Sequence, residues 1–375
     1  MTEQDLGFRC PDLSAATAET ADLGGLRFDD TQYADYEELT QKLGELPAKK
    51  RHILRAALSV NGKVSNDSME KYLSARSYVS SSELKEVLKT PRHYLQYRDP
   101  VVKRDAKHFE LGTFAHSAFL EPKKFDKVRV EPAANLSTKD GIMSMIEWYC
   151  TELCRPLPDL RIMKMNELRD ELAGLREEFD KAGFVSVSAE QKTIIECIRI
   201  AYKTYAGGIL PKLLKLADAE TSFYTTDPAS GINVRIRPDG LFLEENVGFN
   251  GILSLKTTSC QSIDAFARDC AKYMYDLSEG MYLDVASHVT GRQFTATIMV
   301  ALQTVAPYQI FMLWWSPESL ESGKYKYHHA LDVLAECRAK DYYPAFDSFA
   351  EEGGHGLIKF DLPNYAKLSV NEQNV

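Results

Sequence analysis

The chain has 375 residues, of which 44% are hydrophobic and 26% are charged, as in an ordinary globular protein with a sizeable core. Its net charge of −9 argues against a protein that coats nucleic acid through bulk electrostatics, but it leaves room for a local basic cleft. No run of 18 or more residues is apolar, which argues against a transmembrane helix.

Targeting signals and cysteine motifs are also missing from the sequence. The first residues, MTEQDLGFRCPDLS, lack the basic start and the apolar core of a signal peptide, so we expect a cytoplasmic protein with no membrane partner. None of the seven cysteines forms a Cys-x-x-Cys pair. We therefore expect reduced thiols rather than a zinc or iron–sulfur site.

The first 75 residues are polar and weakly patterned, and we interpret them as a helical or irregular appendage. Helices are expected at about residues 33–45 and 48–60, followed by a loop at NGKVSNDS. The pattern becomes clearer from residue 76 onward. Ser80 and Glu83 have the spacing of a capping box, and the apolar residues of LGTFAHSAFL have helical spacing, with His116 close to their face.

Helices continue through the middle of the chain until the period of the pattern changes. Residues 139–181 predict a charged helical insertion with a loop at CRPLPDLR, and Ser188 begins another capped helix. The stretches AETSFYTTD, INVRIRPDGLFLE and GILSLKTTS are short and rich in β-branched residues, which predicts an antiparallel meander. A long helix over about 262–291, two strands broken at Pro307, a final helix and an irregular tail follow. This order predicts a single α/β (α+β-like) core with a helical front.

The meander places one acid and one lysine within reach of each other. Asp239 ends one strand, Lys256 lies in the next, and a hairpin can bring both side chains to one spot. A carboxylate that holds Mg²⁺ and a lysine that orients the attacking water are parts of a metal-dependent phosphodiesterase site. Side chains two residues apart on a strand share a face, so a second carboxylate is expected at residue 254, where this chain has Ser254.

These motifs resemble one nuclease superfamily. RPDG followed by ILSLKTT resembles the core of the PD-(D/E)XK nucleases, which is a central mixed β-sheet flanked by helices. More narrowly, about residues 76–366 resemble the RecE-like exonucleases (exonuclease VIII) of phages and prophages, which leaves 367–375 as a tail. The elements that carry this resemblance are YVSSSELKEVLKTPRHYLQY, LGTFAHSAFLEP, AETSF with GINVRIRPD, YDLSEGMYLD, and the closing YYPAF and LPNYA.

The resemblance implies a role for several residues of this chain. His116, Asp239 and the backbone carbonyl of Leu255 would bind metal, and Lys256 would be the catalytic lysine. Glu220 would be a supporting catalytic acid near the metal. Each residue also has an ordinary interpretation, such as a core histidine at His116 or a turn residue at Asp239. A strand lysine with apolar neighbours is harder to explain without a function.

Two positions depart from the family pattern. Ser254 replaces the Asp or Glu that should bind metal, and Ser278 replaces the Gln of a Gln-x-x-x-Tyr element that ends at Tyr282. A hydroxyl is a poorer ligand than a carboxylate, so Mg²⁺ or Mn²⁺ would bind weakly unless another acid fills the gap. The candidate substitutes, in order of preference, are Glu220, Glu279 and the pair Glu244 and Glu245.

A basic segment and two strand arginines are candidate DNA contacts. Residues 85–107 carry seven basic and three acidic side chains, with aromatic residues between them, in an acidic protein. Arginines on the strand before Asp239 could meet a phosphate. The candidate DNA-binding residues are Arg92, Tyr94, Arg104, Arg235, Arg237 and Tyr282.

We therefore expect a PD-(D/E)XK-fold protein that engages the ends of linear duplex DNA in a bacterial or phage-infected cell. If it is active, it hydrolyses phosphodiesters with Mg²⁺ for recombination or DNA processing. The resemblance also implies degradation from the 5′ end, a ring-like homo-oligomer and a single-strand annealing protein as partner. Two alternatives stay open: a pseudo-nuclease that binds DNA or a partner protein, and a nuclease of the same superfamily that acts on RNA or in repair.

Overall fold

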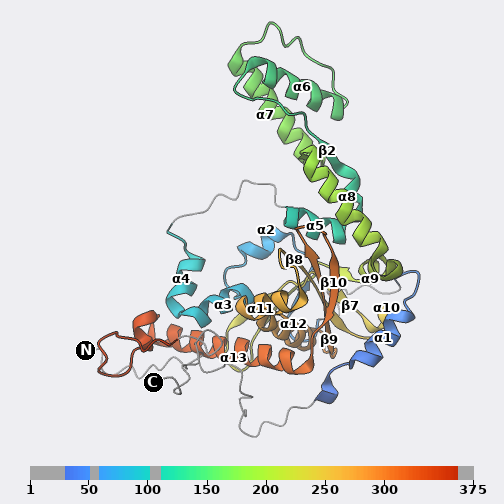
Figure 1. Cartoon of the computed structure of the whole chain (residues 1–375). Coiled ribbons are helices and arrows are strands. Elements are labelled where there is room, and N and C mark those ends of the chain that lie inside the picture. The colour runs from blue at the N-terminus through green and yellow to red at the C-terminus, as the bar shows by residue number, and fades with distance from the viewer. Residues whose placement is uncertain (1–29, 51–58, 102–110, 362–375) are drawn as a thin grey trace, which may run out of the picture.

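The computed structural model describes residues 30–50, 59–101 and 111–361. The body of the protein holds two β-sheets that pack against helices, and a third sheet consists of two parallel strands elsewhere, so the molecule has the expected mixed α/β class (Figure 1). None of the helices in these ranges is long and apolar enough to cross a membrane. Residues 51–58, which make up most of the helix expected at 48–60, lie outside the described residues.

The larger sheet has the strand order β10-β9-β8-β7-β4. β8 and β9 are parallel, whereas the other neighbouring pairs are antiparallel. All side chains of β9 and most of those of β8 are buried, as in a sheet that is covered on both faces. The strands are β4 (Asp218–Ala219), β7 (Gly240–Phe242), β8 (Gly251–Thr258), β9 (Ala296–Gln303) and β10 (Ile310–Trp314).

The smaller sheet joins the N-terminal segment to the body of the protein. Its order is β1-β5-β6, with both pairs antiparallel. The expected meander is therefore divided, because the β5–β6 hairpin belongs to this sheet and the β7–β8 hairpin to the larger one. The residues expected to form an N-terminal appendage supply β1 and the buried Leu39 of α1. These elements are α1 (Tyr36–Gly44), β1 (Lys63–Ser65), β5 (Ser222–Thr226) and β6 (Asn233–Ile236).

Helices pack on both faces of the larger sheet. One hydrophobic cluster joins α3, α12 and α13 to the face that carries Ile252 of β8. A second cluster joins α5, α8 and α9 to the opposite face, which carries Leu253 and Leu255. Side chains of β8 thus alternate between the two layers. The core helices are α2 (Met69–Ser74), α3 (Ser81–Lys89), α4 (Pro91–Arg98), α5 (Leu111–Leu120), α8 (Ala189–Thr204), α9 (Ile209–Leu216), α10 (Glu244–Val247) and α13 (Pro317–Lys340).

The capping boxes expected from the sequence begin two of these helices. Ser80 and Glu83 close the first turn of α3, and Ser188 and Gln191 close that of α8. Each box satisfies backbone N–H groups that the helix itself leaves without partners. Short 3₁₀ turns complete the chain at Asp30–Gln32, Pro122–Lys127, Tyr205–Gly208 and Phe346–Phe349.

The long helix expected over 262–291 is in fact two helices. α11 (Ile263–Lys272) ends and α12 (Tyr275–Thr290) begins around Met274, whose φ of 48° is left-handed. A residue in that conformation cannot continue a right-handed helix. The sequence does not reveal the break, because the apolar pattern runs through it without a Gly or Pro.

α12 and α13 approach each other closely at two glycines. A Cβ atom at Gly280 would lie 2.6 Å from the backbone N of Lys324. A Cβ atom at Gly323 would lie 2.0 Å from the carbonyl oxygen of Asp276. Only glycine allows backbones to meet at this distance. The contact therefore holds α12 against α13 next to Glu279, the residue that precedes Gly280.

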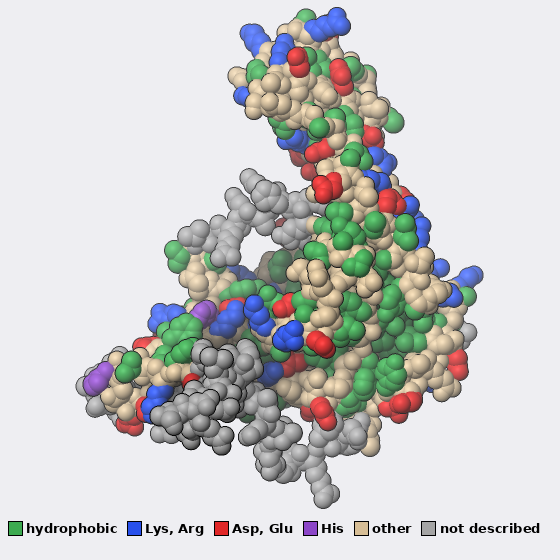
Figure 2. Space-filling model, viewed as in Figure 1, with side chains coloured by type: hydrophobic (Ala, Val, Ile, Leu, Met, Phe, Trp, Pro, Cys, Tyr) green, Lys and Arg blue, Asp and Glu red, His purple; other side chains and the backbone are tan. Residues whose placement is uncertain are grey.

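A helical arm projects from the core (Figure 1). It has a hydrophobic cluster of its own, which includes Ile146, Leu172 and Phe179. Figure 2 shows both basic and acidic side chains at the outer end of the arm and along its length. The two arm helices occupy the residues where a helical insertion is expected. The arm comprises β2 (Val128–Val130), α6 (Lys139–Glu152), α7 (Met165–Lys181) and β3 (Val185–Val187).

Candidate active site

Asp239 and Lys256 meet where the two sheets adjoin. Asp239 lies in the turn between β6 and β7, and its Oδ2 accepts a hydrogen bond of 2.6 Å from the backbone N–H of Leu255 on β8. The Nζ of Lys256 lies 3.8 Å from the same Oδ2. Both side chains keep some contact with solvent, with exposed fractions of 20% for Asp239 and 23% for Lys256. The acid and the lysine that the sequence pairs are thus brought together.

Ser254 lies on the face of β8 that α12 covers, and it contacts a carboxylate there. Its hydroxyl donates a hydrogen bond to Glu279 and lies 2.7 Å from both carboxylate oxygens. Glu279 comes from the first half of α12 and is 0% exposed. Since residue 254 is where the family pattern expects an acid, the Glu279 carboxylate lies beside the position that the missing acid would fill.

The electrostatics of the site link these groups. Burial raises the pKa of Glu279, and the charge of Asp239 raises it further, whereas Lys256, Ser254 and Lys85 act in the opposite direction. Burial alone would lower the pKa of Lys256, but the nearby carboxylates of Asp239 and Glu279 outweigh it, so that this pKa is raised. Lys256 is therefore held in its charged form, while Glu279 is a buried carboxylate that is incompletely compensated.

This set of donors fits a hard divalent cation. Asp239 and Glu279 supply carboxylate oxygens, and the carbonyl oxygen of Leu255 lies at the same spot, 3.2 Å from the Nζ of Lys256. Oxygen donors of this kind suit Mg²⁺ or Mn²⁺, and a cation would offset the charge that burial leaves on Glu279. Within the described residues, no group of three His, Cys, Asp or Glu side chains is arranged to hold a metal.

The helix that carries His116 lies beside the end of β8. A Cβ atom at Gly112, one turn before His116 on α5, would come within 2.7 Å of the Oγ1 of Thr257. α5 therefore packs against the residue next to Lys256. The side chain of His116 lies outside the described part of the structure, so its predicted role as a ligand stays a prediction.

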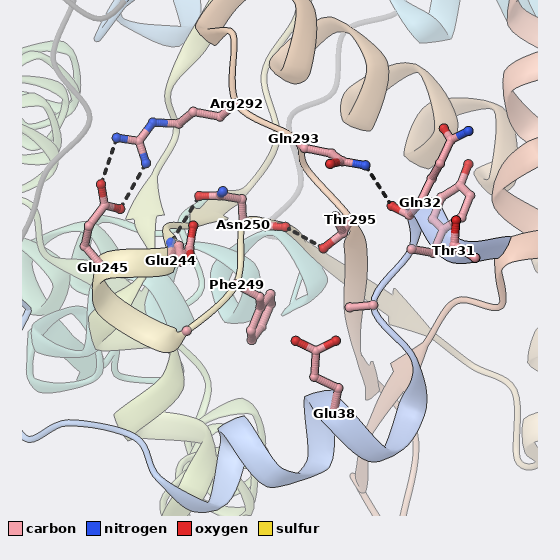
Figure 3. Close-up of a pocket in the computed structure, with 13 residues that line it drawn as sticks. Thr31, Gln32, Glu38, Glu244, Glu245, Phe249, Asn250, Arg292, Gln293 and Thr295 are labelled. Atoms are coloured by element: carbon pink, nitrogen blue, oxygen red, sulfur yellow. Dashed lines mark hydrogen bonds and ion pairs between the residues drawn. The ribbon is translucent and has the colours of Figure 1, made fainter. Parts of the chain in front are cut away.

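Of the other candidate acids, Glu220 lies beside Asp239, whose carbonyl oxygen accepts a hydrogen bond of 3.1 Å from the Glu220 backbone N–H, whereas Glu244 and Glu245 lie elsewhere. Glu220 is in the turn before β5 with a positive φ of 53°, and its half-exposed carboxylate accepts from Arg237 at 3.2 Å. Glu244 and Glu245 line a polar pocket beside the start of β8, opposite the end that carries Lys256 (Figure 3). There Glu245 faces Arg292, with contacts of 2.8 and 3.0 Å.

The two strand arginines make bonds inside the protein. Arg235 is 5% exposed, and its guanidinium donates to the carbonyl oxygens of Tyr72 and Ala75 at the end of α2 and contacts Glu83 at 3.4 Å. The guanidinium of Arg237 donates to the carbonyl oxygen of Asp67 at 2.6 Å, among others. We do not carry these two residues forward as DNA contacts, because both side chains are only 6% exposed and their terminal nitrogens bond inside the protein.

The remaining predicted residues divide between core and surface. Ser278 is buried beside Glu279, and burial raises the pKa of the Tyr282 phenol, which hydrogen-bonds Ser81. Tyr94 is 2% exposed and accepts a hydrogen bond of 2.7 Å from Arg98. Arg92 is exposed on α4, and Arg104 lies outside the described residues. Of the predicted DNA contacts in the described residues, Arg92 alone has an exposed side chain.

Lys85 and Tyr275 lie beside Lys256, but neither has a clear signal in the sequence. The Nζ of Lys85, from α3, lies 5.2 Å from the centre of the Tyr275 ring, and the Nζ of Lys256 lies 5.5 Å from the same centre. Burial and the charge of Lys256 lower the pKa of Lys85 to about 8. In the sequence Lys85 is one charge of a basic segment, and no spacing connects it with Tyr275.

Comparison with known proteins identifies the family of this chain. A search of curated proteins found no match. Among solved structures, the chain is similar to a Eubacterium rectale protein described as a "Putative exonuclease", with 11% identity, 81% of this chain and 98% of that chain covered, and a TM-score of 0.43. That likeness is too low to carry an argument. The family described as "PDDEXK-like domain of unknown function" (DUF3799) matches residues 80–348, well over half of the chain. The expected superfamily and fold class are thus confirmed, and this chain belongs to that PDDEXK-like domain family.

Proposed function

We propose that this chain is a divalent-metal-dependent DNA nuclease in which Glu279 replaces the missing acid of β8. Membership of a PDDEXK-like family supports a nuclease-like function with DNA as substrate, and PD-(D/E)XK nucleases generally use divalent metal ions. The observation that carries the proposal is the contact of 2.7 Å between the Ser254 hydroxyl and the Glu279 carboxylate. It supplies a carboxylate where the sequence lacks one.

Each residue of the site has a part in this chemistry. Asp239, Glu279 and the Leu255 carbonyl would hold the divalent ion, which polarises a phosphate and makes a bound water more acidic. The hydrogen bond from the Leu255 N–H fixes the Asp239 carboxylate, and the one from Ser254 fixes that of Glu279. The charged Lys256 ammonium would orient the attacking water and stabilise negative charge that develops on the phosphate.

The finer expectations remain part of the proposal. These are Mg²⁺ or Mn²⁺ as the ion, ends of linear duplex DNA as the substrate, and a task in recombination or DNA processing. A single-strand annealing partner and a homo-oligomer are further expectations that the resemblance supports. The conclusion on Glu279 does not depend on them, because it rests on contacts within one chain.

Digestion of end-labelled linear duplex DNA with Mg²⁺ or Mn²⁺ tests the proposal. Wild type should shorten the linear duplex and leave a covalently closed circle intact. Glu279→Gln, Asp239→Asn and Lys256→Ala should each lose about 100-fold or more in rate, since each removes charge that acts on the reacting phosphate. Glu244→Gln is the matched control, because Glu244 is an exposed acid at the far end of β8. Equal rates for Glu279→Gln and Glu244→Gln would contradict the proposal.

Binding of Mn²⁺, measured by calorimetric titration without DNA, separates metal loss from other causes. We expect Glu279→Gln and Asp239→Asn to weaken Mn²⁺ binding and Lys256→Ala to leave it intact or strengthen it, because it removes a nearby positive charge. Unchanged Mn²⁺ affinity in Glu279→Gln would exclude that residue as a ligand.

Two observations favour the pseudo-nuclease as a second candidate. In the described residues, no cluster of three metal-ligating side chains is present, and Glu279 is closed off from solvent. A pseudo-nuclease would bind DNA or a partner protein, fail to bind Mn²⁺ and leave every DNA substrate uncut. The digestion and the titration together therefore separate the two candidates.

A further inference from the structure

A row of lysines and tyrosines runs from the site to the protein surface at the α11–α12 junction. The Nζ of Lys272 lies 5.3 Å from the centre of the Tyr273 ring, and Tyr273 is 48% exposed. The rings of Tyr273 and Tyr275 stack, with centres 5.9 Å apart and planes at 27°. Tyr275 in turn is next to both Lys85 and Lys256. Aromatic faces and cations thus alternate outward from the catalytic lysine.

The fold places these residues together for a specific reason. The left-handed Met274 ends α11 and restarts the chain as α12, so that Tyr273 and Tyr275 stack across the break. α3 brings Lys85 from a distant part of the chain, and its Leu84 shares a hydrophobic cluster with Leu277 of α12. In Figure 2, Lys and Arg side chains gather on the visible face over α3 and α11.

Lys85 differs from the other partly buried lysines of the site region in its contacts. Within the described residues, Lys85 has no hydrogen bond and no ion pair, and its one polar contact is with the Tyr275 ring. Lys324 on α13, by comparison, pairs with Asp284 and Glu321 at 3.1 Å each. An ammonium group that is removed from water without a carboxylate partner is costly in the free protein, and an anionic ligand would offset that cost.

We propose that Lys272, Tyr273, Tyr275 and Lys85 form a binding track for single-stranded nucleic acid, which leads one strand to or from Lys256. Bases would stack on the two tyrosines, and the ammonium groups of Lys85 and Lys272 would contact backbone phosphates. This inference rests on the proposed nuclease function and names the form of substrate that the site receives.

The chemistry of the track favours a single strand over a duplex. Bases of a duplex are already stacked and paired, whereas those of a single strand have free faces that any aromatic ring can accept. Apart from the lysine ammonium groups and the tyrosine hydroxyls, these four residues offer no polar group that reads base edges. Binding should therefore tolerate any sequence and should depend strongly on salt.

Fluorescence anisotropy of a labelled oligothymidylate of about 12 nucleotides tests the track. Ca²⁺ replaces Mg²⁺, so that binding is measured without cleavage. Tyr273→Ala and Tyr275→Leu should each raise the Kd roughly 5- to 150-fold, the range expected for one lost base-stacking contact. Lys85→Gln should weaken binding and reduce the slope of log K against log salt by about 0.7, as for one lost phosphate contact on a single strand.

Two matched variants distinguish the track from general effects. Tyr275→Phe keeps the ring and should bind like wild type. Tyr325→Ala removes a tyrosine that is 62% exposed and stacked on His329 of α13, outside the track, and should also bind like wild type. Circular dichroism checks that Tyr275→Leu is folded. If it is not folded, Tyr273→Ala provides the test, because Tyr273 is exposed and its replacement should not disturb the fold.

The outcomes separate this inference from the proposed function. Wild-type affinity in both Tyr273→Ala and Lys85→Gln would overturn the track, whether or not the protein cuts DNA. Loss of binding in both, with a wild type that cuts, supports the track and the nuclease. Loss of binding in both, with a wild type that cuts nothing in Mg²⁺ or Mn²⁺, supports the track and overturns the proposed nuclease function alone.

Discussion

The Ser254 hydroxyl and the Glu279 carboxylate lie 2.7 Å apart, although Ser254 belongs to a strand and Glu279 to a helix 25 residues further along the chain. The hydrogen bond orients the carboxylate and lowers its pKa, while burial raises that pKa. Because Ser254 is small and neutral, it leaves room for the carboxylate of Glu279, which α12 supplies. Serine and glutamate at these two positions thus act as one unit.

Moving the carboxylate from position 279 to position 254 tests whether the two residues act together. Ser254→Asp alone would set two carboxylates against each other and should lower the stability of the metal-free protein by about 1–3 kcal/mol. Glu279→Gln alone should lose nuclease activity. The double variant has one carboxylate again and should recover much of the rate that Glu279→Gln loses, so the two effects are not additive. Urea unfolding and DNA digestion measure them, and strictly additive effects would count against the unit.

The close contact of α12 with α13 predicts that Gly280→Ala is harmful. Its Cβ would meet backbone atoms of α13 at 2.6–2.9 Å, so α12 must shift and Glu279 with it. We expect a loss of about 1–3 kcal/mol in unfolding free energy, together with weaker Mn²⁺ binding. Gly174→Ala on α7 is the matched control, since nothing lies within 4 Å of its Cβ, and it should stabilise by about 0.5–1 kcal/mol. Equal effects of the two variants would be incompatible with this account.

Arg235 should prove a structural residue rather than a DNA contact. Arg235→Met removes the 3.4 Å partner of Glu83, which is 6% exposed, and it removes one of the donors to the carbonyl oxygens of Tyr72 and Ala75 at the end of α2. We expect a loss of roughly 3 kcal/mol in stability, with no change in the salt dependence of DNA binding. Arg92→Met, on the exposed side of α4, should change stability by less than about 0.5 kcal/mol. A reduced salt slope in folded Arg235→Met would return that arginine to the DNA interface.

Lys85 should lower the stability of the free protein at neutral pH. Its pKa is about 8 in the folded chain and higher when unfolded, so between these values the unfolded state binds more protons and stability rises with pH. The destabilisation is complete below pH 8 and disappears towards pH 10.5. With a chelator present, Lys85→Met should therefore be more stable than wild type by about 1–3 kcal/mol at pH 7, and the difference should shrink at pH 9.5. Urea unfolding at the two pH values measures it, and a less stable Lys85→Met at pH 7 would show that the ammonium is well compensated.

Those parts of the site that depend on short-range patterns could be predicted from the sequence. Asp239 and Lys256 belong to one hairpin, and the period of a strand sets which neighbours share a face. The capping boxes of α3 and α8 were equally visible, because their residues are three apart. The superfamily followed from the same local motifs.

Features set by tertiary packing could not be predicted in the same way. We prefer Glu220 to Glu279 as the substitute acid at the level of sequence, because Glu220 is expected on the neighbouring strand. The sequence does not show that Glu220 lies in a turn, where its carboxylate contacts Arg237. The break at Met274 has no Gly or Pro to mark it, so the stacked pair of Tyr273 and Tyr275 was hidden within one expected helix. Arg235 looks like a strand-face cation until α2 covers it.

Because Glu279 lies on α12, the geometry of the site depends on how stably that helix packs against the rest of the protein. When an acid and a lysine stand two apart on one strand, covalent geometry sets their separation at about 7 Å whatever the rest of the protein does. Here the separation depends on how α12 docks between the sheet and α13. In the proposed site, metal binding and helix docking are therefore linked equilibria, and each must strengthen the other by the same factor. A partner that binds α13 would then change metal affinity without touching any proposed ligand.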